Sequence, residues 1–136
     1  VLIQFPFYAG IQGMLSGSGM VTIISDAFSA NSTAETFPYL CYICMAIINF
    51  FIPSSGGIFA VCGEALGTAA LNVGLEPNKF VIAFTSGETI SNIIQPFWAI
   101  PLLGIAGLKM KDIVGYCILF FIVSVILCNL CFILFW

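Results

Sequence analysis

Two short apolar stretches meet at a Pro-Ser-Ser-Gly-Gly turn near the middle of the chain. The stretches cover residues 37–52 and 58–72, and the turn covers Pro53–Gly57. A helix of about 15 residues is roughly 23 Å long at ~1.5 Å per residue. The apolar core of a bilayer is about 30 Å thick, so neither stretch crosses it comfortably. The pattern predicts a re-entrant helical hairpin over residues 37–72, with its tip inside the membrane.

The composition shows why a bilayer is the relevant solvent. Of the 136 residues, 61% are hydrophobic and 7% are charged, and the mean hydropathy is +1.16. A soluble domain carries about 25% charged residues, which this chain could not supply. Only helices and closed barrels satisfy their backbone inside lipid, and the long apolar runs favour helices. We therefore predict an all-α membrane protein. Three lysines and no arginine exclude a nucleic-acid partner.

The remaining segments divide into spans and connections. Residues 85–92 form an almost wholly polar patch inside a stretch long enough to cross, and Pro96 and Pro101 follow it. A polar patch inside a span, followed by proline, is typical of a discontinuous helix. The predicted segments are a transmembrane helix over 1–24, a polar connection over 25–36, the hairpin over 37–72, a broken helix over 79–103 and a transmembrane helix over 113–136.

The ends of these segments indicate orientation and context. Lys109 and Lys111 precede the last span, whereas Lys79 lies at the other end of the interrupted one. The excess of lysine favours a cytoplasmic location for the first two, with the C-terminus facing outward. The chain starts within an apolar stretch and has no initiator methionine. We therefore expect it to be the C-terminal portion of a longer multi-pass protein.

Two polar clusters are the candidate sites. The predicted hairpin tip and the polar patch offer neutral donors and acceptors, and glycine lets a ligand approach the backbone closely. Such groups suit a carboxylate or a weakly held Na⁺ better than a transition metal, which prefers His or Cys. The alternative is a helix kink sealed by Ser and Thr side chains. Candidate substrate-binding residues are Asn49, Ser54, Ser55, Gly56, Gly57, Asn92 and Gln95, and candidate coupling-ion residues are Ser86, Gly87, Glu88 and Thr89.

Two carboxyl groups fall within predicted membrane segments. Burying an ionisable side chain there costs about 2.5–3.5 kcal/mol or more, so each is a functional hypothesis by default. Glu88 stands in the polar patch and is a candidate proton or cation site, or a hydrated residue that lines a cavity. Glu64 follows the tip by two turns, and an interhelical hydrogen bond as a neutral acid is the more probable role for it.

Other motifs carry little chemistry. The six cysteines include two CxxC pairs, Cys41/Cys44 and Cys128/Cys131, but both pairs lie in apolar stretches without histidine or a neighbouring charge. A thiolate is poorly solvated there, so we expect these cysteines to pack as small apolar side chains and to bind no metal. Asn31-Ser32-Thr33 matches a glycosylation sequon, which is a short and common pattern. With no histidine, no arginine and no nucleophile or phosphate-loop motif, we predict that the chain is not an enzyme.

Three segments together resemble the short-chain fatty acid transporter family, a group of bacterial inner-membrane carriers within the wider ion transporter superfamily. They are the start of the chain from Gln4 to Ile11, the sequence Phe-Ile-Pro-Ser-Ser-Gly-Gly at 51–57, and the long run from Asn92 to Lys109. The resemblance covers nearly the whole chain but only the C-terminal third of such a protein. Family tips often read Ser-Gly-Gly-Gly, where Ser55 takes one glycine position, and the family often has Asp where this chain has Glu88.

The resemblance implies one of two inverted repeats, each with a re-entrant hairpin and a broken helix. It also implies uptake of short monocarboxylates such as butyrate or acetoacetate, driven by a cation gradient with Na⁺ or H⁺ as coupling ion and no other cofactor. The expected partners are the substrate, the bilayer and the N-terminal part of the transporter, and a homodimer stays open. The alternatives are a dicarboxylate or amino-acid carrier of the same superfamily, or a non-transporting membrane fragment.

Overall fold

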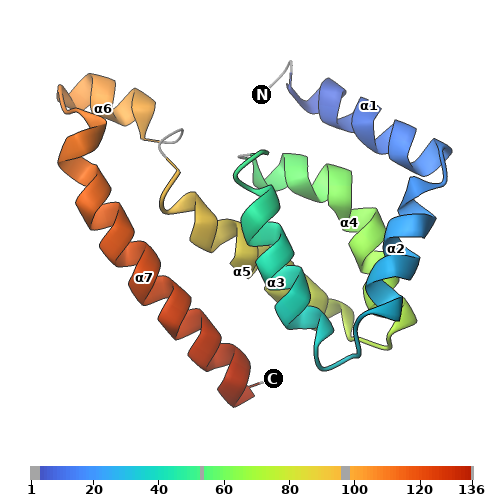
Figure 1. The fold of residues 1–136 in the computed structure, drawn as a ribbon. Coiled ribbons are helices and arrows are strands. Elements are labelled where there is room, and N and C mark those ends of the chain that lie inside the picture. The colour runs from blue at the N-terminus through green and yellow to red at the C-terminus, as the bar shows by residue number, and fades with distance from the viewer. Residues whose placement is uncertain (1–3, 53, 96–98, 136) are drawn as a thin grey trace.

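The described part of the chain is entirely helical, as predicted. The computed structural model describes residues 4–52, 54–95 and 99–135. Their helices are α1 (Gln4–Gly17), α2 (Met20–Ala30), α3 (Phe37–Ile48), α4 (Ser55–Asn72), α5 (Pro77–Asn92), α6 (Ile100–Ala106) and α7 (Met110–Phe135), shown in Figure 1. Proline in the first turn begins both α3 and α5, where its missing N–H costs no helical hydrogen bond.

Two packing partnerships build the core. Helix α3 packs chiefly against α5, whereas α4 packs mainly against α2 and α1 and to a lesser extent against α5. Phe37, Met45, Ile58 and Phe84 are almost completely buried where these helices meet. The ring of Phe84 stands edge-on to that of Phe59, with ring centroids 5.4 Å apart. The predicted hairpin arms α3 and α4 contact each other little, because each packs on another helix.

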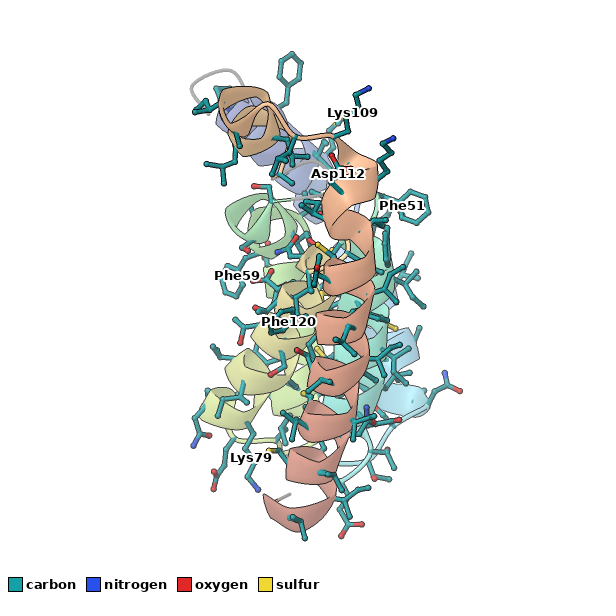
Figure 2. The ribbon with its side chains drawn as sticks, turned by 90° about the vertical axis from the view of Figure 1, so that its left-hand side faces the viewer. Phe51, Phe59, Lys79, Lys109, Asp112 and Phe120 are labelled. Carbon is teal, nitrogen blue, oxygen red and sulfur yellow. The ribbon has the colours of Figure 1, made fainter. Side chains whose placement is uncertain are left out.

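Helix α7 lies along the outside of this core. It contacts α5, and its Phe132 ring meets Tyr42 of α3 at a centroid distance of 5.3 Å. Among the described residues, Met110–Leu134 is the one helical segment that is both long and apolar enough to cross a membrane. Lys109 and Asp112 lie at one end of the molecule and Lys79 lies at the other (Figure 2). This separation agrees with the predicted placement of the lysines.

The N-terminal segment differs from its prediction. A single helix was expected over 1–24, but α1 ends at Gly17 and α2 begins at Met20. Gly19 between them has φ +77°, a left-handed conformation that glycine adopts without steric cost. Helix α2 then continues to Ala30, so residues 25–30 are helical and the polar connection shrinks to 31–36. The polarity of residues 25–30 marked a helix surface rather than a loop.

The hairpin boundaries also shift. The Ser-Ser-Gly-Gly sequence is the start of α4 rather than a turn, since Ser54 is the N-cap and the helix begins at Ser55. The turn lies earlier, between Asn49 and Ser54, and Pro53 falls outside the described residues. Phe51 of this turn lies nearer the level of Asp112 than that of Phe120 in Figure 2. The turn is thus close to one end of α7 rather than at its middle, where a mid-membrane tip was expected.

The polar patch is not where the helix breaks. Residues 85–92, predicted to interrupt a span, are the last two turns of α5. Helix α5 ends at Asn92, the next described helix, α6, begins at Ile100, and α6 and α7 complete the described chain. Ser and Thr within the patch bond back to carbonyl oxygens of their own helix, as when Thr85 donates to Val81 at 2.8 Å. These internal bonds let a polar sequence remain helical.

Candidate functional site

Asn49 anchors a group of buried polar residues between α3 and α5. It follows α3 directly and is completely buried. Its side-chain Nδ2 donates to the backbone oxygen of Glu88 at 3.1 Å, to Ser91 Oγ at 2.9 Å and to Asn92 Oδ1 at 2.8 Å. One amide thus joins the end of α3 to the last turns of α5. Two of these partners, Glu88 and Asn92, were predicted as site residues.

Gln95 completes the same group from the segment that follows the end of α5. Its Nε2 donates to the backbone oxygen of Asn49, and its own backbone N–H donates to Asn92 at 3.2 Å. Glu88 and Ser91 are three residues apart and lie on one face of α5, and Gln95 joins them from just beyond its end. We call Asn49, Glu88, Ser91, Asn92 and Gln95 the polar seam.

A glycine allows the two helices to come this close. A Cβ atom on Gly87 would lie 2.2 Å from the backbone oxygen of Tyr42 and 3.1 Å from the backbone nitrogen of Ala46. Both atoms belong to the α3 backbone, so no side-chain rotation could make room. Gly87, predicted as an ion-coupling residue, is therefore a contact point between helices in this structure.

The start of α4 meets the polar seam. Ser54 caps the helix by accepting a hydrogen bond from the Gly57 backbone N–H at 3.3 Å. The next residue, Ser55, lies near the Glu88 carboxyl group. The two polar clusters found in the sequence are therefore neighbours in space, although their nearest members, Gly57 and Thr85, are 28 positions apart in the chain. This contact is the central feature of the candidate site.

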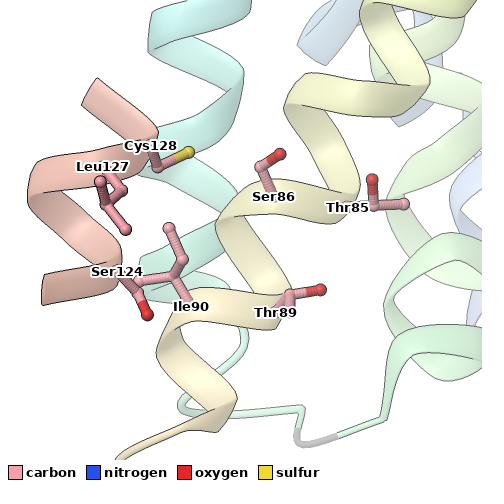
Figure 3. A pocket seen from close by; sticks show the side chains of 7 residues that line it. All are labelled: Thr85, Ser86, Thr89, Ile90, Ser124, Leu127 and Cys128. Carbon is pink, nitrogen blue, oxygen red and sulfur yellow. The ribbon is translucent and has the colours of Figure 1, made fainter. Parts of the chain in front are cut away.

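Other predicted residues lie apart from the seam. Ser86 and Thr89 face the opposite side of α5, where they line a cavity of about 350 Å³ against α7 (Figure 3). Its walls are formed by Thr85, Ser86, Thr89, Ile90, Ser124, Leu127 and Cys128. Glu64 is exposed on α4 and belongs to neither place. Of the two predicted carboxyl groups, the structure thus brings Glu88 close to the start of α4, whereas Glu64 lies apart from the candidate site.

Ser91 was missed as a site residue although it lies in the polar patch. It accepts from Asn49 and donates to the backbone oxygens of Gly87 and Glu88, at 3.1 Å and 3.0 Å. Its spacing from Glu88 and Gln95 on a helical face could have indicated its place. That signal was hidden because the patch was expected to be unwound.

Three buried oxygen atoms of the seam lack a hydrogen-bond partner among the described residues. They are Asn49 Oδ1, Glu88 Oε2 and Gln95 Oε1. Nearly all buried polar atoms in proteins are paired, so three together in one group call for an explanation. The cysteines do not contribute to this group, and all six are unpaired thiols. Within the described residues, no cluster of three or more His, Cys, Asp or Glu side chains could hold a metal ion.

Comparison with known proteins decides the family. The family model described as "Short chain fatty acid transporter" matches residues 1–135. The chain belongs to the short-chain fatty acid transporter family. This confirms the resemblance found in the sequence, and the family consists of membrane transporters rather than enzymes.

Two relatives show how much of such a protein the chain represents. A protein of Escherichia coli (strain K12) named "Putative short-chain fatty acid transporter" is 45% identical over 118 residues, covering 87% of this chain and 27% of the relative. A protein of the same name from Haemophilus influenzae (strain ATCC 51907 / DSM 11121 / KW20 / Rd) is 43% identical over 117 residues, covering 86% and 26%. The chain therefore spans about a quarter of the length of these relatives. No solved structure matches it.

Proposed function

We propose that the chain is part of a secondary active transporter that carries short-chain monocarboxylates, such as butyrate or acetoacetate, across the bacterial inner membrane. Family membership and the names of both relatives support a short-chain fatty acid as cargo. The observation that carries the proposal within this chain is the contact between Ser55 at the start of α4 and Glu88 in the polar seam. In the proposed site, the start of α4 would bind the substrate anion beside a group able to bind a proton or cation.

The substrate carboxylate would bind at the start of α4. The first backbone N–H groups of a helix have no partner within the helix, and the helix dipole favours an anion there. Ser54 and Ser55 add hydroxyl groups, while the exposed Gly56 leaves its backbone accessible. Asn49, Asn92 and Gln95 lie on the seam beside this point. A dicarboxylate would need a second positive group, and both Lys79 and Lys109 lie at the ends of the molecule (Figure 2).

Transport would be coupled to a cation gradient through the seam. Glu88 is 5% exposed and can carry either a proton or, as a carboxylate, a Na⁺ ion. In the proposed architecture α3 and α4 form a hairpin that enters from the Lys79 side, and the chain is one of two inverted repeats of a multi-pass protein. The N-terminal repeat, and in a homodimer a second copy, would be its protein partners. Inverted repeats place substrate and ions between discontinuous helices, which fits the break after Asn92.

Uptake by reconstituted vesicles tests this proposal. The complete transporter that contains this sequence is measured for butyrate uptake under separate Na⁺ and pH gradients. We expect gradient-driven uptake to weaken in Glu88→Gln, with much of the substrate exchange retained because exchange needs no net coupling step. Glu64→Gln makes the same chemical change at an exposed position of α4 and serves as the matched control.

Two results would count against the proposal. Absence of butyrate uptake under either gradient would reject monocarboxylate transport. Equal gradient dependence in the wild type and Glu88→Gln would reject Glu88 as the coupling group.

A further inference from the structure

We infer that the polar seam binds a small alkali cation of the Na⁺ class. Its available ligands are Asn49 Oδ1, the Glu88 carboxylate and Gln95 Oε1. This inference rests on the proposed function and deepens it. It assigns Asn49 and Gln95 to the cation, whereas sequence analysis assigned both to the substrate. The substrate carboxylate keeps only the start of α4.

Burial and lack of partners single out these three side chains. Asn49, Glu88 and Gln95 are 0%, 5% and 7% exposed. Each has one oxygen atom without a hydrogen-bond partner among the described residues. They come from both sides of one contact, since Asn49 follows α3 and donates to the backbone of Glu88, while Gln95 donates to the backbone of Asn49.

The orientation of both amide groups follows from their backbone partners. Asn49 contacts the backbone oxygen of Glu88 at 3.1 Å, and a carbonyl oxygen can only accept. The atom facing it must be Nδ2, which leaves Oδ1 as the unpartnered atom. Gln95 is fixed in the same way, because its Nε2 faces the backbone oxygen of Asn49. Both unpartnered amide atoms are therefore acceptors.

The chemistry of the seam calls for positive charge. Its unpartnered buried atoms are three oxygens, so a second carboxylate would find only repulsion there. Hard oxygen ligands of this kind suit alkali and alkaline-earth cations, and thiol or imidazole ligands for softer metals do not point into the seam. A single proton on Glu88 would supply a donor for one oxygen at most. A metal cation can contact several oxygens at once, which favours it over the proton.

A cation in the seam would also explain coupling. A substrate carboxylate at the start of α4 would lie near the Glu88 carboxyl group, because Ser55 in the first turn of α4 is close to that group. Two like charges at close range disfavour each other, and a cation between Glu88 and the substrate removes that penalty. Cation and substrate then bind more tightly together than apart, and the strengthening is reciprocal.

The test measures cation binding without transport. The purified complete transporter is unfolded thermally in detergent while NaCl replaces choline chloride at constant ionic strength. A ligand that binds only the folded state raises Tm with its concentration. We expect Na⁺ to raise Tm in the wild type, and we expect butyrate to lower the Na⁺ concentration at half effect by about tenfold. Glu88→Gln and Gln95→Leu should lose the response, and Glu64→Gln should keep it.

The outcomes separate this inference from the proposed function. A wild-type Tm that is indifferent to Na⁺ overturns the cation site even if both variants fail to fold. A Tm that responds to pH but not to Na⁺ also overturns it, in favour of a proton on Glu88. Butyrate uptake without Na⁺ binding leaves the transport proposal standing, whereas Na⁺ binding without butyrate uptake removes that proposal and leaves the site.

Discussion

At the scale of single residues, Gly87 determines how closely α3 and α5 approach. The backbone of Tyr42 and Ala46 occupies the space that a larger residue would need. A glycine within a helix otherwise costs up to about 1 kcal/mol relative to alanine. Its place here is therefore explained by contact with the neighbouring helix rather than by its conformational freedom.

Gly87→Ala should separate α3 from α5 and lower the free energy of unfolding by at least ~2 kcal/mol, since forced overpacking against a backbone has no cheap relief. Thermal unfolding in detergent measures the change. Gly115→Ala is the matched control, because a Cβ at Gly115 in α7 meets nothing within 4 Å. Equal unfolding temperatures for the two variants would contradict the close contact.

Replacement of Asn49 tests how much the hydrogen bonds of the polar seam stabilise the fold. Asn49→Asp is nearly isosteric but removes the amide donor and faces a carboxylate toward three acceptors on α5. An uncompensated buried charge costs about 3–5 kcal/mol, and we expect a loss of that size in the free energy of unfolding at neutral pH. Chemical denaturation of the purified protein measures it.

Asn78→Asp provides the comparison for that experiment. Asn78 is exposed and uses its Oδ1 to accept from the Lys79 backbone N–H at 2.9 Å, a bond that a carboxylate can keep. We expect little change there. If Asn49→Asp were as mild as Asn78→Asp, the hydrogen bonds of the seam would not stabilise the fold.

At the scale of elements, thiol labelling can measure how deeply the turn between α3 and α4 enters the membrane. Helix α3 has 12 residues, or roughly 18 Å at ~1.5 Å per residue, which is well short of a bilayer core. In a background without the six native cysteines, a re-entrant hairpin predicts that Ser55→Cys resists impermeant thiol reagents from the Lys109 side, even though Phe51 of the turn lies near the level of Asp112. Thr36→Cys and Val73→Cys should react on their own side. Free labelling of residue 55 from the Lys109 side would indicate two ordinary spans.

The sequence predicted the elements better than their ends. The long apolar run of α7 and the polar turn before α5 could be predicted, because each is defined by the composition of a short stretch of sequence. The break at Gly19 was not visible, because four glycines share that segment and only the structure shows which one takes a positive φ. The patch at 85–92 was read as unwound because back-bonding by Ser and Thr leaves no trace in a hydropathy pattern.

The candidate site was predictable in its members but not in its grouping. Asn49, Ser55, Glu88 and Gln95 stood out as polar residues in apolar surroundings. Their separation from Ser86 and Thr89 depends on the helical continuity of α5, which turns each successive residue by about 100° and so points neighbours in sequence to different sides. The role of Gly87 could not be foreseen, since it depends on the backbone of a helix about 40 residues away in sequence.

At the scale of the whole molecule, the chain is expected to be insufficient for transport. It spans about a quarter of its relatives, and a pseudo-symmetric site needs groups from both repeats. Vesicles that contain only these 136 residues should show no gradient-driven butyrate accumulation, while the complete transporter serves as the positive control. Robust accumulation by the short chain would contradict the two-repeat architecture.

The unequal packing of α3 and α4 has a mechanical consequence. Helix α3 is held to α5 through Gly87 and Asn49, whereas α4 rests mainly on α2 and α1, so the two arms pack on different neighbours. The short link at 49–54 is then the natural hinge between them. Rotation about it would draw the start of α4 away from Glu88, which would part the substrate anion from the cation proposed to bind there and open the way for release.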